Sequence, residues 1–94
     1  MMREYNFTVI LKTEPSDEQT ERLYGYFGAG GTAPETVLDV LIGVRSGIPY
    51  LAAAVRAESF EAAINDILPA LRGEGLDLVR VEMDAAELGG LLAA

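Results

Sequence analysis

Residues 37–55 read VLDVLIGVRSGIPYLAAAV, and this stretch is the most informative part of the chain. Two apolar runs, 37–44 and 50–55, flank a short segment that contains Gly47 and Pro49. Apolar runs on either side of a glycine- and proline-containing turn are typical of two paired antiparallel strands. The stretch therefore predicts a β-hairpin. Its first strand is so apolar that another part of the protein has to cover one of its faces.

Alternation along the hairpin assigns each side chain to one of two faces, because successive residues of a strand point to opposite sides. The expected inner face comprises Leu38, Val40, Ile42, Val44, Leu51, Ala53 and Val55. The expected outer face comprises Val37, Asp39, Leu41, Gly43, Tyr50, Ala52, Ala54 and Arg56. We expect helices to cover the inner set.

The residues before the hairpin predict one strand and one helix. Residues 5–12 alternate, with Tyr5, Phe7, Val9 and Leu11 on one side, which is the pattern of a strand with one buried face. Ser16 and Gln19 then match the capping box, in which each side chain satisfies a free amide of the first helical turn. Glycines 28, 30 and 31 end this helix.

The residues after the hairpin predict a second helix and a fourth strand. Ser59 is the expected N-cap, and apolar residues recur at helical spacing from Phe60 to Leu71. Pro69 conflicts with this pattern, because proline removes a helical hydrogen bond and crowds the preceding turn. The helix should therefore kink there or end near Leu68. Residues 76–83 read as the last strand.

The order strand, helix, strand, strand, helix, strand predicts the split β-α-β arrangement of the ferredoxin-like fold, an α+β sandwich. We expect a four-stranded antiparallel sheet with the first and third strands central, the second and fourth at the edges, and both helices on one face. Residues 1–84 would form this single domain. Residues 85–94 would form a short C-terminal helix or a frayed tail.

Composition disfavours several classes of function. Fifteen acidic against seven basic residues give a net charge of −8, which would repel nucleic acid phosphates. The chain has no histidine and no cysteine, so the commonest general base and the soft metal ligands are missing. We expect no enzyme activity, catalytic residue, metal or cofactor. No apolar run is long enough for a membrane helix, and the MMREYNF start is not a secretory signal, so the expected location is the cytoplasm.

The outer sheet face is the candidate functional surface. The second strand would be an edge strand with one charge in eight residues, whereas native edge strands are usually blunted. The outward side chains would form an exposed apolar patch, which marks an interaction site. The predicted interface residues are Ile10, Val37, Leu41, Tyr50, Ala52, Ala54 and Leu78. We therefore expect a homodimer, or a complex with another protein, through the open sheet face or the edge of the second strand.

A second hypothesis is a small-ligand sensor resembling ACT domains, which share this topology and bind amino acids at dimer interfaces. The chain departs from that pattern in the loop after its first strand. Residues 13–16 read TEPS there, where ACT domains have a glycine-containing loop.

The chain also resembles a group of small, uncharacterised bacterial α/β proteins. The segments that carry the resemblance are YNFTVIL at 5–11, RAESFEAAI at 56–64, the Gly75-Leu76 turn and VRVE at 79–82. Many members of that group continue into a helix-turn-helix, which implies a regulatory or antitoxin-like context. The segment AAELGGLL at 85–92 resembles the start of such a continuation. The group implies no catalytic residues.

Overall fold

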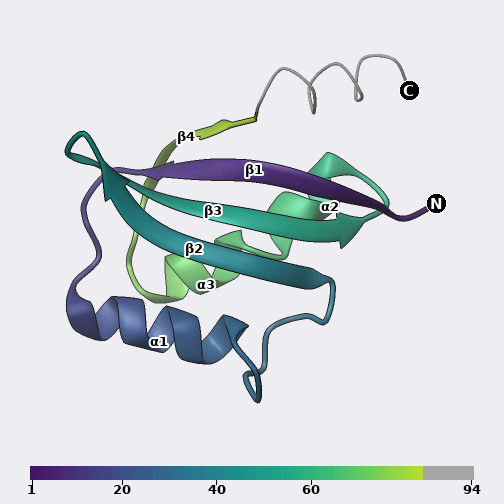
Figure 1. Ribbon diagram of the computed structural model, residues 1–94, viewed down its shortest axis with the longest axis horizontal. Coiled ribbons are helices and arrows are strands. Elements are labelled where there is room, and N and C mark those ends of the chain that lie inside the picture. The colour runs from purple at the N-terminus through teal and green to yellow at the C-terminus, as the bar shows by residue number, and fades with distance from the viewer. Residues whose placement is uncertain (84–94) are drawn as a thin grey trace.

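The computed structural model describes residues 1–83 of the 94-residue chain. These residues form four strands and three helices (Figure 1). The elements are β1 (Arg3–Leu11), α1 (Asp17–Phe27), β2 (Val37–Arg45), β3 (Ile48–Ala57), α2 (Phe60–Asn65), α3 (Leu68–Gly73) and β4 (Leu78–Glu82). The C-terminal helix or tail expected at residues 85–94 lies outside the described residues.

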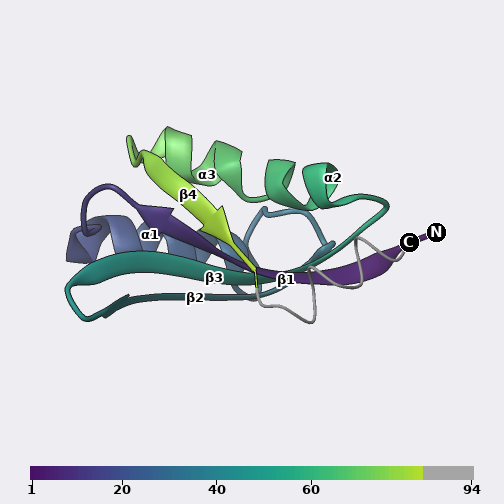
Figure 2. The ribbon, with the colours of Figure 1, turned by 90° about the horizontal axis from the view of Figure 1, so that it is seen from above.

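The strands form one antiparallel sheet in the order β2-β3-β1-β4. Strands β1 and β3 are therefore central, and β2 and β4 are the edges, as the element order predicts. Figure 2 shows α1, α2 and α3 on the same side of this sheet. The predicted α+β architecture, a four-stranded antiparallel sheet with its helices on one face, is confirmed.

A two-residue turn joins β2 to β3. Arg45 pairs with Ile48, so Ser46 and Gly47 alone form the loop. Both loop residues have positive φ, 52° and 78°, which a type I′ hairpin turn requires. The predicted hairpin is confirmed, although its turn is shorter than the Arg45–Pro49 segment that the sequence suggests.

The hydrophobic core lies between the sheet and the helices. Along β1, Tyr5, Phe7 and Val9 are buried, whereas Asn6 between them is exposed. The largest fully buried side chains are Leu51, Ile67, Leu71, Val9 and Val55. Strand alternation thus divides each strand into one buried set and one set on the other side of the sheet.

Helix α1 is capped as predicted and is tied to the end of α3. The Ser16 hydroxyl accepts from the Gln19 amide at 3.1 Å, and the Gln19 side-chain oxygen accepts from the Ser16 amide at 2.8 Å. Gln19 Nε2 also donates to the Glu74 carbonyl at 2.8 Å. Arg22 completes the link with an ion pair to the Glu74 carboxylate at 2.8 Å.

The predicted second helix is two short helices, because Pro69 cannot continue the first. Helix α2 begins after the Ser59 cap and ends at Asn65, which is four residues before Pro69. A proline ring clashes with the carbonyl four residues earlier, so the break falls where the clash would occur. Pro69 then lies in the first turn of α3, where its missing N–H costs no hydrogen bond.

Candidate functional site

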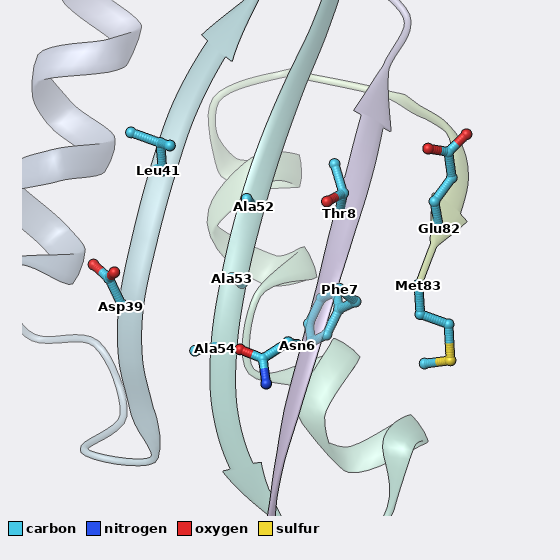
Figure 3. A pocket seen from close by; sticks show the side chains of 10 residues that line it. All are labelled: Asn6, Phe7, Thr8, Asp39, Leu41, Ala52, Ala53, Ala54, Glu82 and Met83. Atoms are coloured by element: carbon cyan, nitrogen blue, oxygen red, sulfur yellow. The ribbon is translucent and has the colours of Figure 1, made fainter. Parts of the chain in front are cut away.

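The sheet face opposite the helices, called the open face below, carries its side chains in regular rows. One row, the Thr8 row, crosses all four strands, because Ala52 pairs with both Thr8 and Leu41, and Thr8 also pairs with Glu82. The next row toward the hairpin turn, the Ile10 row, contains Gly43, Tyr50, Ile10 and Arg80. Figure 3 shows Thr8, Leu41, Ala52 and Glu82 from their four strands.

Three further rows complete the open face, and one of them, at the end away from the turn, pairs Glu4 with Arg56. The Asn6 row, on the side of the Thr8 row away from the turn, joins Asp39, Ala54 and Asn6. Arg45 and Ile48 form the last pair of the hairpin, beyond the Ile10 row. The open face is therefore a small grid, with every position set by strand register.

Two adjoining hollows lie on this face. The first has a volume of about 490 Å³ and is lined by Asn6, Phe7, Thr8, Asp39, Leu41, Ala52, Ala53, Ala54, Glu82 and Met83 (Figure 3). The second has a volume of about 350 Å³ and is lined by Thr8, Ile10, Leu41, Arg45, Ile48, Tyr50, Ala52, Arg80 and Glu82. Four residues of the Thr8 row line both hollows, so together they form one depression across the sheet.

Five of the predicted interface residues lie on the open face and line these hollows: Ile10, Leu41, Tyr50, Ala52 and Ala54. Their accessibility differs. Leu41 is 55% exposed, whereas Ile10 is only 7% exposed and forms part of the floor. The small Ala52 and Ala54 side chains leave the middle of the face low.

The expected outward position of Val37 is wrong. The register of β2 against β3 shifts between Val37 and Asp39, so that Val37 pairs with Val55 and Asp39 pairs with Ala54. Such a bulge inserts one unpaired residue and reverses the alternation on one side of it. Val37 therefore packs against the core, and Leu38, which was expected to point inward, is 49% exposed. Val44, also expected inward, is exposed at the hairpin end.

The expected position of Leu78 on the open face is wrong for the same reason. The register of β1 against β4 shifts between Ile10, which pairs with Arg80, and Leu11, which pairs with Leu78. Leu11 is a core residue, so its partner lies on the helix side of the sheet. Leu78 accordingly lines a hollow with Leu68 and other residues around α3.

Four charged residues of the open face separate into two halves, and the paired Glu4 and Arg56 lie beyond them at the end away from the turn. Arg45 and Arg80 lie toward the hairpin turn, whereas Asp39 and Glu82 lie toward the other end. Arg80 Nε donates to Glu82 at 2.7 Å, across the boundary between the halves. Arg80 and Glu82 were not among the residues predicted for the site. Their alternation within β4 places them on one face, but only the pairing with Thr8 and Ile10 identifies that face.

Tyr50 is the largest side chain of the open face, and its neighbours fix its position. It pairs with Gly43, and a Cβ atom added to Gly43 would lie 2.8 Å from the Tyr50 hydroxyl. The Tyr50 side chain therefore lies over Gly43, in space that the Cβ atom of any other residue at position 43 would occupy. The Arg45 guanidinium is 5.6 Å from the centre of the Tyr50 ring, a cation–π distance.

The β2 edge is partly blocked by side chains. The Tyr24 hydroxyl accepts from the Ile42 amide at 2.7 Å and is 3.3 Å from the Ile42 carbonyl oxygen. The Asp39 carboxylate accepts from the Val40 amide at 3.0 Å. Backbone groups that another strand would need are thus already paired in the middle of β2. Tyr24 was not among the residues predicted for the site, because only the packing of α1 beside β2 brings its hydroxyl to Ile42.

Within residues 1–83, no three acidic side chains lie close enough together to hold a metal ion. No helix of the described part is long and apolar enough to cross a membrane. The polar groups that line the larger hollow belong to Asn6, Thr8, Asp39 and Glu82.

Two comparisons of the sequence of this chain gave no match. Its sequence matches no model of a protein family, and no curated protein matches it. The open face and its residues are therefore interpreted from their own geometry.

Proposed function

We propose that this protein is a non-catalytic assembly domain of ferredoxin-like topology that joins copies of itself through the open face. The strand order, with β1 and β3 central, supports the topology. The missing histidine and cysteine and the resemblance to small bacterial α/β proteins support a cytoplasmic, non-enzymatic role. A regulatory or antitoxin-like context is the setting that the resemblance implies.

The observation that carries the proposal is the depression across the sheet face that the helices leave uncovered. Its floor holds Thr8, Ala52 and Ala54, which are short side chains that allow another surface to approach closely. Leu41, Ile48 and Tyr50 add apolar surface beside it. An exposed apolar patch with a polar rim is typical of a protein–protein interface.

The open face is a better candidate than the β2 edge. Addition of a strand at an edge needs free backbone donors and acceptors. Tyr24 and Asp39 already pair with the backbone of Ile42 and Val40. A docking strand would have to displace both side chains, so the edge is blunted in the way that native edges usually are.

A small-ligand regulatory domain is the second candidate, and one observation favours it. The hollow of about 350 Å³ is within the size range of ligand sites, and Arg45, Arg80 and Tyr50 line it. Thermal-shift measurements with amino acids and nucleotides test this candidate, because a ligand that binds only the folded state raises its stability. A shift that saturates with ligand concentration supports it, and no shift contradicts it.

Light scattering of the wild-type chain and two matched variants tests assembly. We expect a species of twice the 10.1 kDa monomer mass at micromolar concentration. Ala52→Glu places a carboxylate in the floor of the depression and should give a monomer. Ala62→Glu, on the exposed surface of α2, makes the same change away from the open face and should leave the dimer intact. If the wild-type chain is a monomer at micromolar concentration, the proposal is overturned.

A further inference from the structure

The two halves of the open face differ in size as well as in charge. The half near the hairpin turn carries Ile48, Tyr50 and Ile10. The other half has Ala52 and Ala54 on β3 and Thr8 on β1. On β1 and β3, the half near the turn is therefore the bulkier one. It contains Arg45 and Arg80, whereas the other half contains Asp39 and Glu82, with the Glu4–Arg56 pair at its far end.

We infer that the occupant of the open face is a second copy of this chain, turned so that the basic half of each copy packs on the acidic half of the other. This inference rests on the proposed function and specifies its geometry. A two-fold axis would run across the strands, between the two sheets and halfway between the Thr8 row and the Ile10 row. Each strand would then lie antiparallel to the same strand of the partner.

Charge complementarity is the first argument for this geometry. Such an axis exchanges the position of Arg45 with that of Asp39, because they are six residues apart on β2 and lie equally far from the axis. It also exchanges the positions of Arg80 and Glu82. Arg45 and Arg80 would each face a carboxylate of the partner. The only ion pairs among residues 1–83 are Arg22–Glu74 and Arg80–Glu82, so Arg45 has no carboxylate partner within its own described chain.

Size complementarity is the second argument, and it depends on different residues. The same axis sets Tyr50 opposite the partner's Ala52, and Ile48 opposite the partner's Ala54. It also sets Leu41 opposite the partner's Gly43, where the Tyr50 ring lies. Large side chains thus meet small ones along β3, whereas Leu41 meets the partner's Tyr50 ring.

The contact has the form of an aligned β-sandwich. Two sheets that pack face to face lie about 10 Å apart with their strands about 30° from alignment, because each sheet is twisted. A two-fold contact is isologous, so each favourable pair occurs twice in the dimer. The overall charge of −8 makes a second copy a repulsive partner at long range, and the local matching of opposite charges would decide the register.

Single charge reversals test the register. Arg45→Asp would place two carboxylates opposite each other at two points of the dimer, and Asp39→Arg would do the same with two cations. We expect each variant to weaken homodimerisation at least about tenfold, since like charges that face each other in an interface are strongly unfavourable. Arg72→Asp, on the exposed surface of α3, produces the same net charge change as Arg45→Asp and should leave the dimer intact.

Mixing the two reversed variants gives the sharper result. A pair made of one Arg45→Asp chain and one Asp39→Arg chain has opposite charges at both points, so equal amounts of the two monomers should form a heterodimer. The variant with both substitutions in one chain should form a homodimer again. Native mass spectrometry distinguishes these species, and circular dichroism checks that each variant is folded.

The outcomes separate the register from the proposed function. If Ala52→Glu gives a monomer but the charge reversals leave the wild-type dimer unchanged, the open face is the interface and the register is wrong. If the reversed variants are monomers and their mixture stays monomeric, the register is also wrong. If the wild-type chain is a monomer, both the register and the proposed function fail.

Discussion

The two faces of the sheet are built from neighbouring residues, yet they have opposite environments. On β3, Leu51 and Val55 are fully buried under the helices, whereas Ala52 and Ala54 between them line the depression of the open face. The helix-covered face is closed by large apolar side chains that interlock. The open face is low, partly polar and charged at both ends. The helix-covered face of the sheet therefore provides the packing that stabilises the single chain, and the open face stays available for contact.

Stability and assembly should therefore respond to different substitutions. A change on the helix-covered face removes interactions that exist within one chain. A change on the open face removes few such interactions.

The largest effect is expected in the core. Ile67→Ala should lower the free energy of unfolding by about 2–5 kcal/mol, because it removes a fully buried side chain and leaves a cavity. Leu41→Ala, at an exposed position of the open face, should change it by about 0.5 kcal/mol or less. Urea unfolding monitored by circular dichroism, at concentrations where the chain is monomeric, measures both. Equal losses for the two variants would mean that the open face also contributes to the stability of the monomer.

A smaller effect is expected at the edge of β2. Tyr24→Phe removes the hydroxyl that pairs with the Ile42 amide and should cost about 0.5–1.5 kcal/mol of stability. Hydrogen exchange of the Ile42 amide should become faster. The Val40 amide, which donates a hydrogen bond to the Asp39 carboxylate, should keep its exchange rate. If the Ile42 amide exchanges equally in both proteins, Tyr24 does not protect the edge, and the edge becomes the better interface candidate.

The smallest effect is expected at the exposed link between α1 and α3. The hydrogen bond from Arg22 lowers the pKa of Glu74 below its usual value of 4.5. A lowered pKa in the folded state means that this group stabilises the fold above the pKa it has when unfolded, and that its contribution is lost as pH falls through the folded pKa. NMR titration of the Glu74 carboxyl should show a midpoint below 4.5.

Glu74→Gln is the matched variant for this link. It should make unfolding stability slightly less sensitive to pH in the acidic range, since the shifted group is gone. The open face should not respond, so dimer formation at neutral pH should match that of the wild type. A weaker dimer would show that the helix side and the open face are coupled.

Local signals predicted most of the fold correctly. Ser16 with Gln19 and Ser59 mark helix starts through hydrogen bonds to amides no more than three residues away, so their geometry is independent of the rest of the molecule. Pro69 marks a helix break that is also local, because its ring clashes with the carbonyl only four residues earlier. The strand order followed from the order of elements, because few connections of that length pack well.

The two misplaced interface residues show where local signals fail. Val37 and Leu78 were assigned by strict alternation, and each lies beside a register shift that a neighbouring strand determines. A bulge changes which residues are paired without changing the apolar pattern of the strand itself. The positions of Leu41, Tyr50, Ala52 and Ala54 were predictable, because no bulge falls between them and the turn, and the position of Ile10 follows from its regular pairing with Tyr50.

The period of the apolar pattern and the capping residues are properties of the chain alone, and they specify which segments become strands and helices and in what order. Contacts between distant segments specify the rest. Tyr24 reaches the backbone of Ile42 only once α1 packs beside β2. Arg80 and Glu82 join the face of Arg45 and Asp39 only once β4 pairs with β1. The open face depends on strand register, which arises from pairing between segments and is therefore fixed only when the sheet is assembled.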